Sequence, residues 1–490
     1  MPIQLQLVAA AVFLAFFSGL GAAEVVHYPP TSSNINNLTF ALNGSGAPGI
    51  YSSSKTPDKQ YGQYNWCNMP HVRTREYKTP PPDYNLEYVE VIQRHHKRTP
   101  YASNTFFKES VCWSCAGQGP LYGIKSNRGI GAVVTDIQWQ AFQDAQNPWT
   151  TKVGPGFVGS TCQFPQITDQ GLEDSITHGQ DLRAVYAQRL NLNPYFNPAT
   201  SRIRVTNNVI TSQVASGLVK GLFPASAGIE AIIQSSSFDS LEPTYSCNKA
   251  SQLKSSITTG SQVWNDHLAA AAGLYAKLDA ISGISPSDTA GWHTSFDHYY
   301  DNLSAKQCHG KALPCNLNST SSCVTQDIAD TVYRLGNWEY SWQWRDAPQS
   351  AQYAALKYGA WVLELKNKLQ NKVSGQSKGT HDLTPVLQLK YVHNIAHDGS
   401  ISPLLGFLQI SKMVWPGMGS EVVFELYSKA SGAYGSDKRS YFIRVLWSGQ
   451  PIQTSTPLGT IDLVPVDKFF SYIDSTVGSS SALFNACNAQ

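Results

Sequence analysis

The chain has 490 residues, enough for one large domain or two of medium size, and 42% of them are hydrophobic, as a sizeable buried core requires. A mainly disordered chain is therefore not the expected class. Charged residues make up 14% and nearly cancel to a formal net charge of +2, so no overall field favours nucleic acid or a membrane surface. Specific binding of an anion must therefore come from a local cluster of charges.

An apolar run over residues 5–19 is followed by small residues up to Ala23 and then by the polar Glu24. This is the pattern of a signal peptide, and the run is shorter than the roughly 20 apolar residues that a membrane anchor requires. We predict a signal peptide at 1–23 and no membrane association after cleavage. The exported protein would be extracellular, and the pattern leaves open whether it is free, vacuolar or attached to a cell wall.

All nine cysteines lie after the predicted leader, and in an oxidising compartment they favour disulfide bonds over metal thiolates. The odd number leaves at least one thiol outside an intrachain pair. We expect at least one local bridge within the close trio Cys308, Cys315 and Cys323. Cys112 and Cys115 have the spacing of a redox motif, but in an exported chain a structural bridge between them is the favoured interpretation.

Four Asn-X-Ser/Thr sequences are candidate glycosylation sites, and a glycan requires the asparagine to be exposed. They begin at Asn37, Asn43, Asn302 and Asn318. Glycans at these positions would agree with export.

The region after the leader, residues 24–84, is rich in Ser, Asn, Thr, Gly and Pro and ends in three consecutive prolines. We interpret it as an N-terminal arm laid over the main domain. Alternating β-branched and aromatic residues then predict a strand over 86–92. Helical spacing of apolar residues predicts helices over 167–190 and 209–223, on either side of a short strand at 203–206.

Residues 250–372 have a different pattern, with long helical segments such as 262–281 and 349–369 and no strand signal between them. The strand period returns at 386–396 and in a pair of segments that form a hairpin, 421–427 and 441–447. We therefore predict an α/β fold, a mixed sheet flanked by helices, interrupted by an all-helical insert. The predicted parts are the α/β core at 85–249 and 373–490, the latter including the C-terminal tail, and the insert at 250–372.

A basic run, Arg94-His95-His96-Lys97-Arg98-Thr99-Pro100, follows directly after the predicted strand 86–92. On composition alone such a run is most often a solvated surface or a trafficking signal. Its position favours a binding site, because ligands of open α/β sheets bind at the carboxyl ends of strands. Two guanidinium groups around one imidazole match the oxygens of a phosphate group.

The run resembles the signature Arg-His-Gly-X-Arg-X-Pro of the histidine acid phosphatases, a family that includes phytases and the prostatic and lysosomal acid phosphatases; the likeness is to a secreted member of fungal type. His96 stands where the family usually has glycine, and Ile210 where a second arginine is usual. Further similar segments follow in the family's order along the chain. The matches are Arg94, His95, Arg98 and Pro100; Thr168, Gly171, Gly179, Leu182, Arg183 and Tyr186; Arg204, Thr206 and Thr211; Gly221 to Pro224; His397 and Asp398; and the hairpin 420–447.

The resemblance implies a phosphoglycerate mutase-like fold and hydrolysis of small phosphate monoesters at acidic pH, with no metal or organic cofactor. His95 would attack phosphorus and form a phosphohistidine, and Asp398 would protonate the leaving group. Nearby arginines would lower the pKa of His95 and keep its lone pair available. The implied phosphate-binding residues are Arg94, Arg98, Arg204 and His397, with His96 and Lys97 as possible substrate contacts.

The expected active site lies in the cleft between the sheet domain and the insert. His393 and His397 have a zinc-like spacing, but on a strand their side chains lie about 13 Å apart, so we expect no metal site. One alternative is a phytase or inositol polyphosphate phosphatase, which would need more basic residues around the cleft than the insert supplies. Another is a secreted binding protein that keeps the fold without turnover. The oligomeric state stays open.

Overall fold

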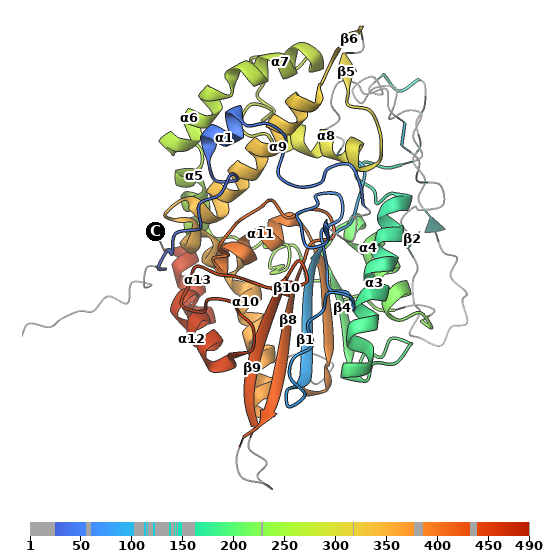
Figure 1. Cartoon of the computed structure of the whole chain (residues 1–490), viewed down its shortest axis with the longest axis vertical. Helices are drawn as coiled ribbons and strands as arrows, with labels where there is room; N and C mark the ends of the chain where they lie inside the picture. Colours follow the sequence, from blue (N-terminus) through green and yellow to red (C-terminus); the bar gives the residue numbers. More distant parts are fainter. Residues whose placement is uncertain are drawn as a thin grey trace, which may run out of the picture.

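The computed structural model describes residues 25–54, 60–101, 162–226, 229–316, 318–376, 386–431 and 439–489, together with isolated positions between 112 and 148. A mixed seven-stranded sheet occupies the lower half of Figure 1 in the order β10-β9-β8-β1-β7-β4, with β11 paired to β9. This sheet, flanked by helices, confirms the predicted fold class. Its strands are β1 (Asn85–Arg94), β4 (Ser201–Val205), β7 (Tyr391–Ala396), β8 (Glu421–Ala430), β9 (Arg439–Trp447), β10 (Gln450–Pro451) and β11 (Val464–Pro465).

The three strands β1, β7 and β4 are parallel and end at the same edge of the sheet. Arg94, the last residue of β1, is level with Ala396, the last residue of β7, and Val205 at the end of β4 is level with Ile395. β8 runs antiparallel to β1 on its other side. The segments that follow the three parallel strands therefore meet at one place.

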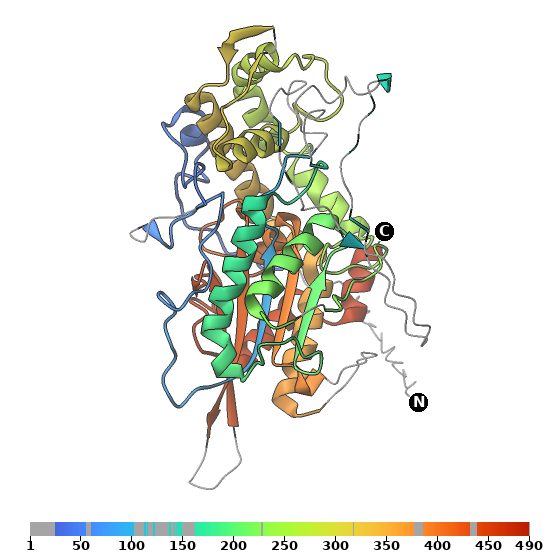
Figure 2. The same cartoon turned by 90° about the vertical axis from the view of Figure 1, so that its right-hand side faces the viewer.

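Helices cover both faces of the sheet, as Figures 1 and 2 show. One face packs against α3 and α4, and the other against α10, α11 and α12. A side chain at Gly179 or Gly221 would collide with backbone of the opposite helix, so these glycines permit the close approach of α3 and α4. The helices are α3 (Asp169–Leu190), α4 (Val209–Leu222), α5 (Asn248–Ile257), α10 (Ser350–Ser374), α11 (Asp398–Phe407), α12 (Val466–Thr476) and α13 (Ser480–Asn488).

A separate helical core lies beyond the end of the sheet, at the top of Figure 1. The predicted helix 262–281 is two helices that meet at Ala271. The block is also not purely helical, because β5 (Cys315–Asn316) and β6 (Ser319–Cys323) pair as a small hairpin. The domain boundaries at 250 and 372 stay a prediction. The remaining elements are α1 (Leu38–Asn43), α6 (Gln262–Ala270), α7 (Ala272–Ser282), α8 (Asp297–Cys308), α9 (Gln326–Ser341), the π-helix η4 (Trp342–Asp346), the 3-10 helix η5 (Val386–Gln388), β2 (Leu121–Tyr122) and β3 (Ile137–Gln138).

Eight of the nine cysteines form disulfides, and Cys112 is free and exposed. The predicted local bridge in the close trio is confirmed as Cys315–Cys323. The predicted bridge between Cys112 and Cys115 is wrong. Cys115 and its partner Cys162 share a small buried cluster with Trp113, whereas Cys112 lies at the surface and outside that cluster. The other two pairs are Cys67–Cys308 and Cys247–Cys487.

The candidate glycosylation sites differ in exposure. Asn37, Asn43 and Asn318 are exposed, but the Asn302 side chain on α8 is fully buried, so a glycan there is incompatible with this fold. The predicted signal peptide at 1–23 lies outside the described residues. None of the helices in the described ranges combines the length and the apolar character that a bilayer span needs.

Candidate active site

The loop after β1 is held at the sheet edge by backbone hydrogen bonds on two sides. The His95 amide donates to the Ala396 carbonyl at the end of β7 (3.0 Å), and the Gly419 amide donates to the His95 carbonyl (3.0 Å). Gly419 has a left-handed backbone (φ +69°), and a side chain there would collide with the His96 ring. The fold thereby fixes the His95 backbone where β1, β7 and β4 end.

The His95 imidazole keeps one nitrogen available. Its Nδ1–H donates to the His96 carbonyl (2.9 Å), which leaves the lone pair on Nε2 without a protein partner in the described part of the chain. Burial lowers the pKa of this histidine well below its usual value, and the cations of Arg98 and Arg94 lower it further. His95 therefore presents a neutral, unprotonated nitrogen.

Arg94 and Arg98 lie on either side of His95 in sequence, and both are buried. Nη2 of Arg94 is 3.3 Å from Asp398 Oδ2, and Nη2 of Arg98 is 2.8 Å from Asp301 Oδ1. The Nε–H group of each arginine is buried and has no partner among the described residues. Two charged donors thus remain for an anion.

Asp398 begins α11 and is surrounded by donors. Its Oδ2 accepts from Trp415 Nε1 (2.6 Å) and from the Tyr340 hydroxyl (3.2 Å). Burial raises its pKa, but Arg94, the Trp415 N–H and the neighbouring histidine outweigh burial, so its pKa lies below the ordinary value. In the free protein this carboxyl group is therefore ionised except at low pH.

His397 caps α11 and faces His95, with ring centroids 5.4 Å apart. Its Nε2 lies 2.9 Å from Thr206 Oγ1 and 3.6 Å from Glu242 Oε1. Burial lowers its pKa to about 4; Asp398 opposes this shift, and Arg94 adds to it. His397 is thus a neutral imidazole above that pH.

The structure brings five of the predicted site residues together: Arg94, His95, Arg98, His397 and Asp398. Their arrangement offers a nitrogen nucleophile, two cations and a carboxyl group within one buried region. Among the described residues, no group of three or more His, Cys, Asp or Glu side chains is arranged to hold a metal ion. The catalytic roles of the five residues stay predictions.

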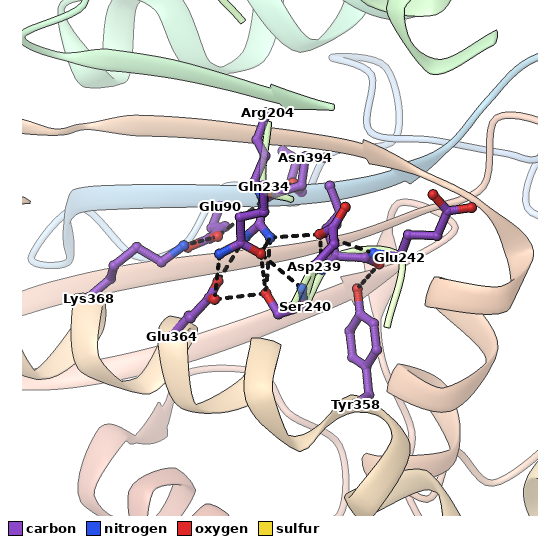
Figure 3. A network of polar contacts seen from close by, with 12 residues as sticks. Glu90, Arg204, Gln234, Asp239, Ser240, Glu242, Tyr358, Glu364, Lys368 and Asn394 are labelled. Atoms are coloured by element: carbon purple, nitrogen blue, oxygen red, sulfur yellow. Dashed lines mark hydrogen bonds and ion pairs between the residues drawn. The ribbon is translucent and has the colours of Figure 1, made fainter. Parts of the chain in front are cut away.

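Arg204 does not join this group. It lies level with Asn394, two residues before the Ala396 end of β7, or about 7 Å below the edge. Figure 3 shows its guanidinium turned toward Glu364 on α10 (2.8 Å) and Asp239 (3.2 Å). Both terminal nitrogens are committed there, so the predicted phosphate contact is replaced by a structural one.

His96 and Lys97 also turn away from the site. His96 Nε2 contacts Gln93 Nε2 (2.9 Å) and His178 Nδ1 (3.2 Å) inside the protein. Lys97 is buried and pairs with Asp174 (3.2 Å) on α3. Neither side chain is placed to contact substrate, because each is taken up by partners on other elements.

Three side chains that border the site were not predicted from the sequence: Asp301, Trp415 and Glu242. Asp301 and Trp415 come from segments far from the basic run, and nothing in their local sequence marks them. Thr206 belongs to the matched Arg-X-Thr segment, but its contact with His397 was not predicted. Glu242 follows Asp239 in a loop, and no regular period signals its direction.

No family model matches the chain, but several curated proteins resemble it over most of its length. Counting factor 60 of Dictyostelium discoideum is 26% identical over 399 residues, which cover 79% of this chain and 84% of that protein. 2-Phosphoxylose phosphatase 1 of Danio rerio is 22% identical, with 87% and 86% covered. Lysophosphatidic acid phosphatase type 6 of Bos taurus is 25% identical, with 79% and 82% covered.

Solved structures share the fold at low sequence identity. The multiple inositol polyphosphate phosphatase of Bifidobacterium longum, in complex with inositol hexasulfate, has a TM-score of 0.50 and 12% identity; 89% of this chain and 99% of that one are covered. The phytase of Hafnia alvei in complex with myo-inositol hexakis sulphate has a TM-score of 0.50 and 15% identity, with 82% and 99% covered. These similarities establish a common architecture.

Proposed function

Because the chain belongs to the histidine acid phosphatase family, we propose that it is a secreted acid phosphatase that hydrolyses small phosphate monoesters through a phosphohistidine on His95. One observation carries the proposal. His95 has its Nδ1–H held by a carbonyl and its Nε2 lone pair available, beside two arginines that each keep one unused Nε–H donor. A nucleophile and an anion-binding pair therefore share one sheet edge.

The first step transfers the phosphoryl group to the enzyme. The Nε2 lone pair of His95 attacks phosphorus while the bond from phosphorus to the ester oxygen breaks. Arg94 and Arg98 stabilise the charge on the equatorial oxygens. An alcohol leaves poorly as an alkoxide, so the Asp398 carboxylic acid gives its proton to the departing oxygen. The products are the free alcohol and phosphohistidine.

The second step returns the enzyme to its starting state. The Asp398 carboxylate takes a proton from water as the water oxygen attacks phosphorus. The bond from phosphorus to Nε2 breaks, and inorganic phosphate leaves. Asp398 thus ends protonated, ready for the next substrate.

The charges around Asp398 favour activity in acid. In the free protein Arg94 holds the pKa of Asp398 below its ordinary value, so this group ionises as the pH rises. A bound phosphate dianion would engage Arg94 and add negative charge, and both effects raise the pKa of Asp398. His95 stays unprotonated at moderately low pH because its own pKa is lowered. Activity should therefore fall as the pH increases through the pKa of Asp398 in the complex.

The charge count around the site favours substrates with few negative groups. Arg94 and Arg98 are accompanied by three carboxyl groups, those of Asp398, Asp301 and Glu242. With Arg204 committed elsewhere, a polyanion such as phytate would meet no surplus of cations among these residues. We therefore prefer a phosphatase of broad specificity to a phytase.

Export is part of the proposal. Four disulfides agree with an oxidising compartment, and three of the four candidate glycosylation asparagines are exposed. Cleavage after the leader would release a protein that acts outside the cytosol, where acidic conditions suit the mechanism.

The decisive experiment follows hydrolysis of p-nitrophenyl phosphate and glycerol 2-phosphate by the purified protein across a pH series, with a chelator present. We expect a rate maximum in acid and no effect of the chelator. Quenching the reaction in alkaline denaturant should preserve a phosphorylated peptide that contains His95, because phosphohistidine is labile in acid but not in alkali.

His95→Ala serves as the control and should show neither turnover nor the labelled peptide. A folded wild-type protein with no activity on either substrate would contradict the proposal and favour the non-catalytic alternative. Turnover without a labelled peptide would contradict the covalent route alone.

A further inference from the structure

The hydroxyl groups around His397 determine which of its nitrogens carries the proton. The Thr211 hydroxyl donates to backbone carbonyls, those of Asn208 (2.8 Å) and Thr206 (3.1 Å), which can only accept. Its oxygen can therefore accept from the Thr206 hydroxyl, 3.1 Å away. Thr206 Oγ1 is then the acceptor for His397 Nε2–H at 2.9 Å. This assignment uses every contact and puts the proton of the neutral ring on Nε2.

A neutral His397 in this form cannot donate to phosphate. Its Nδ1, which has no hydrogen-bond partner in the described ranges, carries a lone pair and would repel a phosphate oxygen. Only the imidazolium form has N–H groups on both nitrogens. Use of His397 in phosphate binding therefore requires a second proton.

Glu242 supplies the charge that favours this second proton. Its Oε1 lies 3.6 Å from His397 Nε2, on the side already occupied by Thr206. A carboxylate next to one ring nitrogen stabilises the imidazolium while the other nitrogen turns to the ligand. The distance is longer than a hydrogen bond, and such contacts tighten when a ligand completes the site.

The loop that carries Glu242 is held in place by the Arg204 network of Figure 3. Asp239 Oδ1 accepts from Arg204 (3.2 Å), from the Leu241 amide (2.8 Å) and from the Glu242 amide (3.4 Å). On the far side, Lys357 Nζ donates to the Pro243 carbonyl (2.8 Å). In Figure 3 the Glu242 carboxylate points away from this network. The network therefore fixes the backbone of the loop without using the charge of Glu242, which remains available to His397.

We propose that Glu242 is a positioning residue for His397, which takes up a proton from solvent on Nδ1 when an anion binds and then donates it in a hydrogen bond to the anion. This inference rests on the proposed function, because it assigns a task at the same site. It adds a carboxylate, acting through the histidine, that the family resemblance did not point to.

The titratable and charged groups recorded near His397 come from several elements. Arg94, His95 and Arg98 come from the end of β1 and the loop after it, Asp398 from α11, and Glu242 from the loop before α5, where Asp239 lies beside Glu242. In the free protein, burial and the two arginines hold the pKa of His397 at about 4, although the charge of Asp398 opposes this shift. An anion that occupies the arginines removes their opposition. Burial and Asp239 raise the pKa of Glu242, which makes its carboxylate a stronger acceptor.

The test measures proton uptake when inorganic sulfate binds. Sulfate is a dianion throughout the relevant pH range, so any proton taken up goes to the protein. Calorimetric titrations at about pH 5.5, in two buffers with different ionisation enthalpies, count these protons. They would be made on wild type, Glu242→Gln and Asp398→Asn, with Asp467→Asn on α12 as a control that removes a distant carboxylate.

We expect part of the proton uptake on sulfate binding to come from His397. Asp398→Asn should keep this part, and Glu242→Gln should lose it. Without its carboxylate, the pKa of His397 in the complex should fall by about one unit, which weakens sulfate binding up to tenfold in acid. At about pH 8 His397 is neutral in both wild type and Glu242→Gln. The variant should then bind sulfate as tightly as wild type or slightly more tightly. Asp467→Asn should behave as wild type at both pH values.

Three other results would overturn the proposal. Tighter sulfate binding by Glu242→Gln at every pH, with unchanged proton uptake, would make Glu242 a simple source of repulsion. No change at all would make it a bystander. Loss of turnover on glycerol 2-phosphate but not on p-nitrophenyl phosphate would make Glu242 the proton donor itself. Sulfate binding does not depend on turnover, so the first two outcomes are separate from failure of the proposed phosphatase activity, and the third can be observed only if that activity is present.

Discussion

The protein has two groups of buried histidines near the end of β1 and β7, and they differ in what their ring nitrogens contact. His95 and His397 stand at the sheet edge, and each keeps one nitrogen without a partner in the described chain. Behind them, hydrogen bonds and one ring stack, that of His71 on His178, link a second group from Asp181 at one end to Tyr391 at the other. This group, the histidine chain, is His71, His96, His178 and His393.

Burial and a lowered pKa are common to both groups, so neither property identifies a catalytic histidine here. Burial lowers the pKa of His178 to about 3 and that of His393 well below its usual range, as it does for His95. What differs is the surroundings of the unpartnered nitrogen: the Nδ1 atoms of His71 and His96 also have no partner among the described residues, but both are closed off inside the protein. In the histidine chain both nitrogens of His178 and of His393 have partners within the protein, whereas the Nε2 of His95 faces the site.

Among the substitutions that test this difference, His95→Ala should have the largest effect. If Nε2 is the nucleophile, kcat should fall by at least about 10⁴-fold, the scale seen when a catalytic nucleophile is removed. Steady-state assays with an aryl phosphate measure this loss, and circular dichroism checks that the protein is folded. A loss of less than tenfold in a folded sample would move the nucleophile elsewhere.

Asp398→Asn should have the next largest effect. An amide cannot give a proton to the leaving oxygen, so hydrolysis of glycerol 2-phosphate should slow by about 10² to 10⁴-fold. The loss should be much smaller for p-nitrophenyl phosphate, whose leaving group departs without protonation. The fall of the rate at increasing pH should also disappear, since it reports the ionisation of this group. Equal losses on both substrates would argue that Asp398 only orients Arg94.

His393→Gln should change stability and leave catalysis nearly intact. It disrupts the contacts with Gln93 (2.7 Å) and Tyr391 (2.8 Å), which costs about 1–3 kcal/mol of unfolding free energy at neutral pH. The turnover number should stay within about threefold of wild type, because His393 does not border the free nitrogen of His95.

The effect of His393→Gln on stability should also depend on pH, in a direction set by the lowered pKa of His393. The unfolded chain binds a proton on His393 below its ordinary pKa and the folded chain does not, so this group costs stability as the pH falls. His393→Gln lacks that cost. Its loss of unfolding free energy relative to wild type should therefore be smaller at about pH 4.5 than at neutral pH. Urea unfolding at both pH values measures this. An equal deficit at both would show that His393 is already protonated in the fold.

The sequence predicted the fold and the centre of the site because both rest on local patterns. Alternating residues marked β1 and β7, and a parallel pair of strands brings whatever follows them to one edge. Arg94, His95 and His397 therefore meet. The mixed sheet flanked by helices is confirmed in the same way, while the small hairpin closed by Cys315–Cys323 was missed because its strands are very short.

The misassigned residues fail for a geometric reason. A motif gives the order of residues but not their height on a strand, and Arg204 lies two positions too low to reach the edge. Ile210, where the family usually has arginine, is fully buried in the core beside α3. Glu242 could not be found in advance, since its direction depends on contacts with Arg204 and Lys357 from distant parts of the chain.

The two long-range disulfides have a consequence for a chain that is cut after export. Cys67–Cys308 encloses one stretch of the backbone and Cys247–Cys487 another, and the two stretches overlap between 247 and 308. Any single proteolytic cleavage between residues 67 and 487 therefore falls inside at least one closed ring. The two fragments would stay joined and would travel together on a gel until a reducing agent separated them.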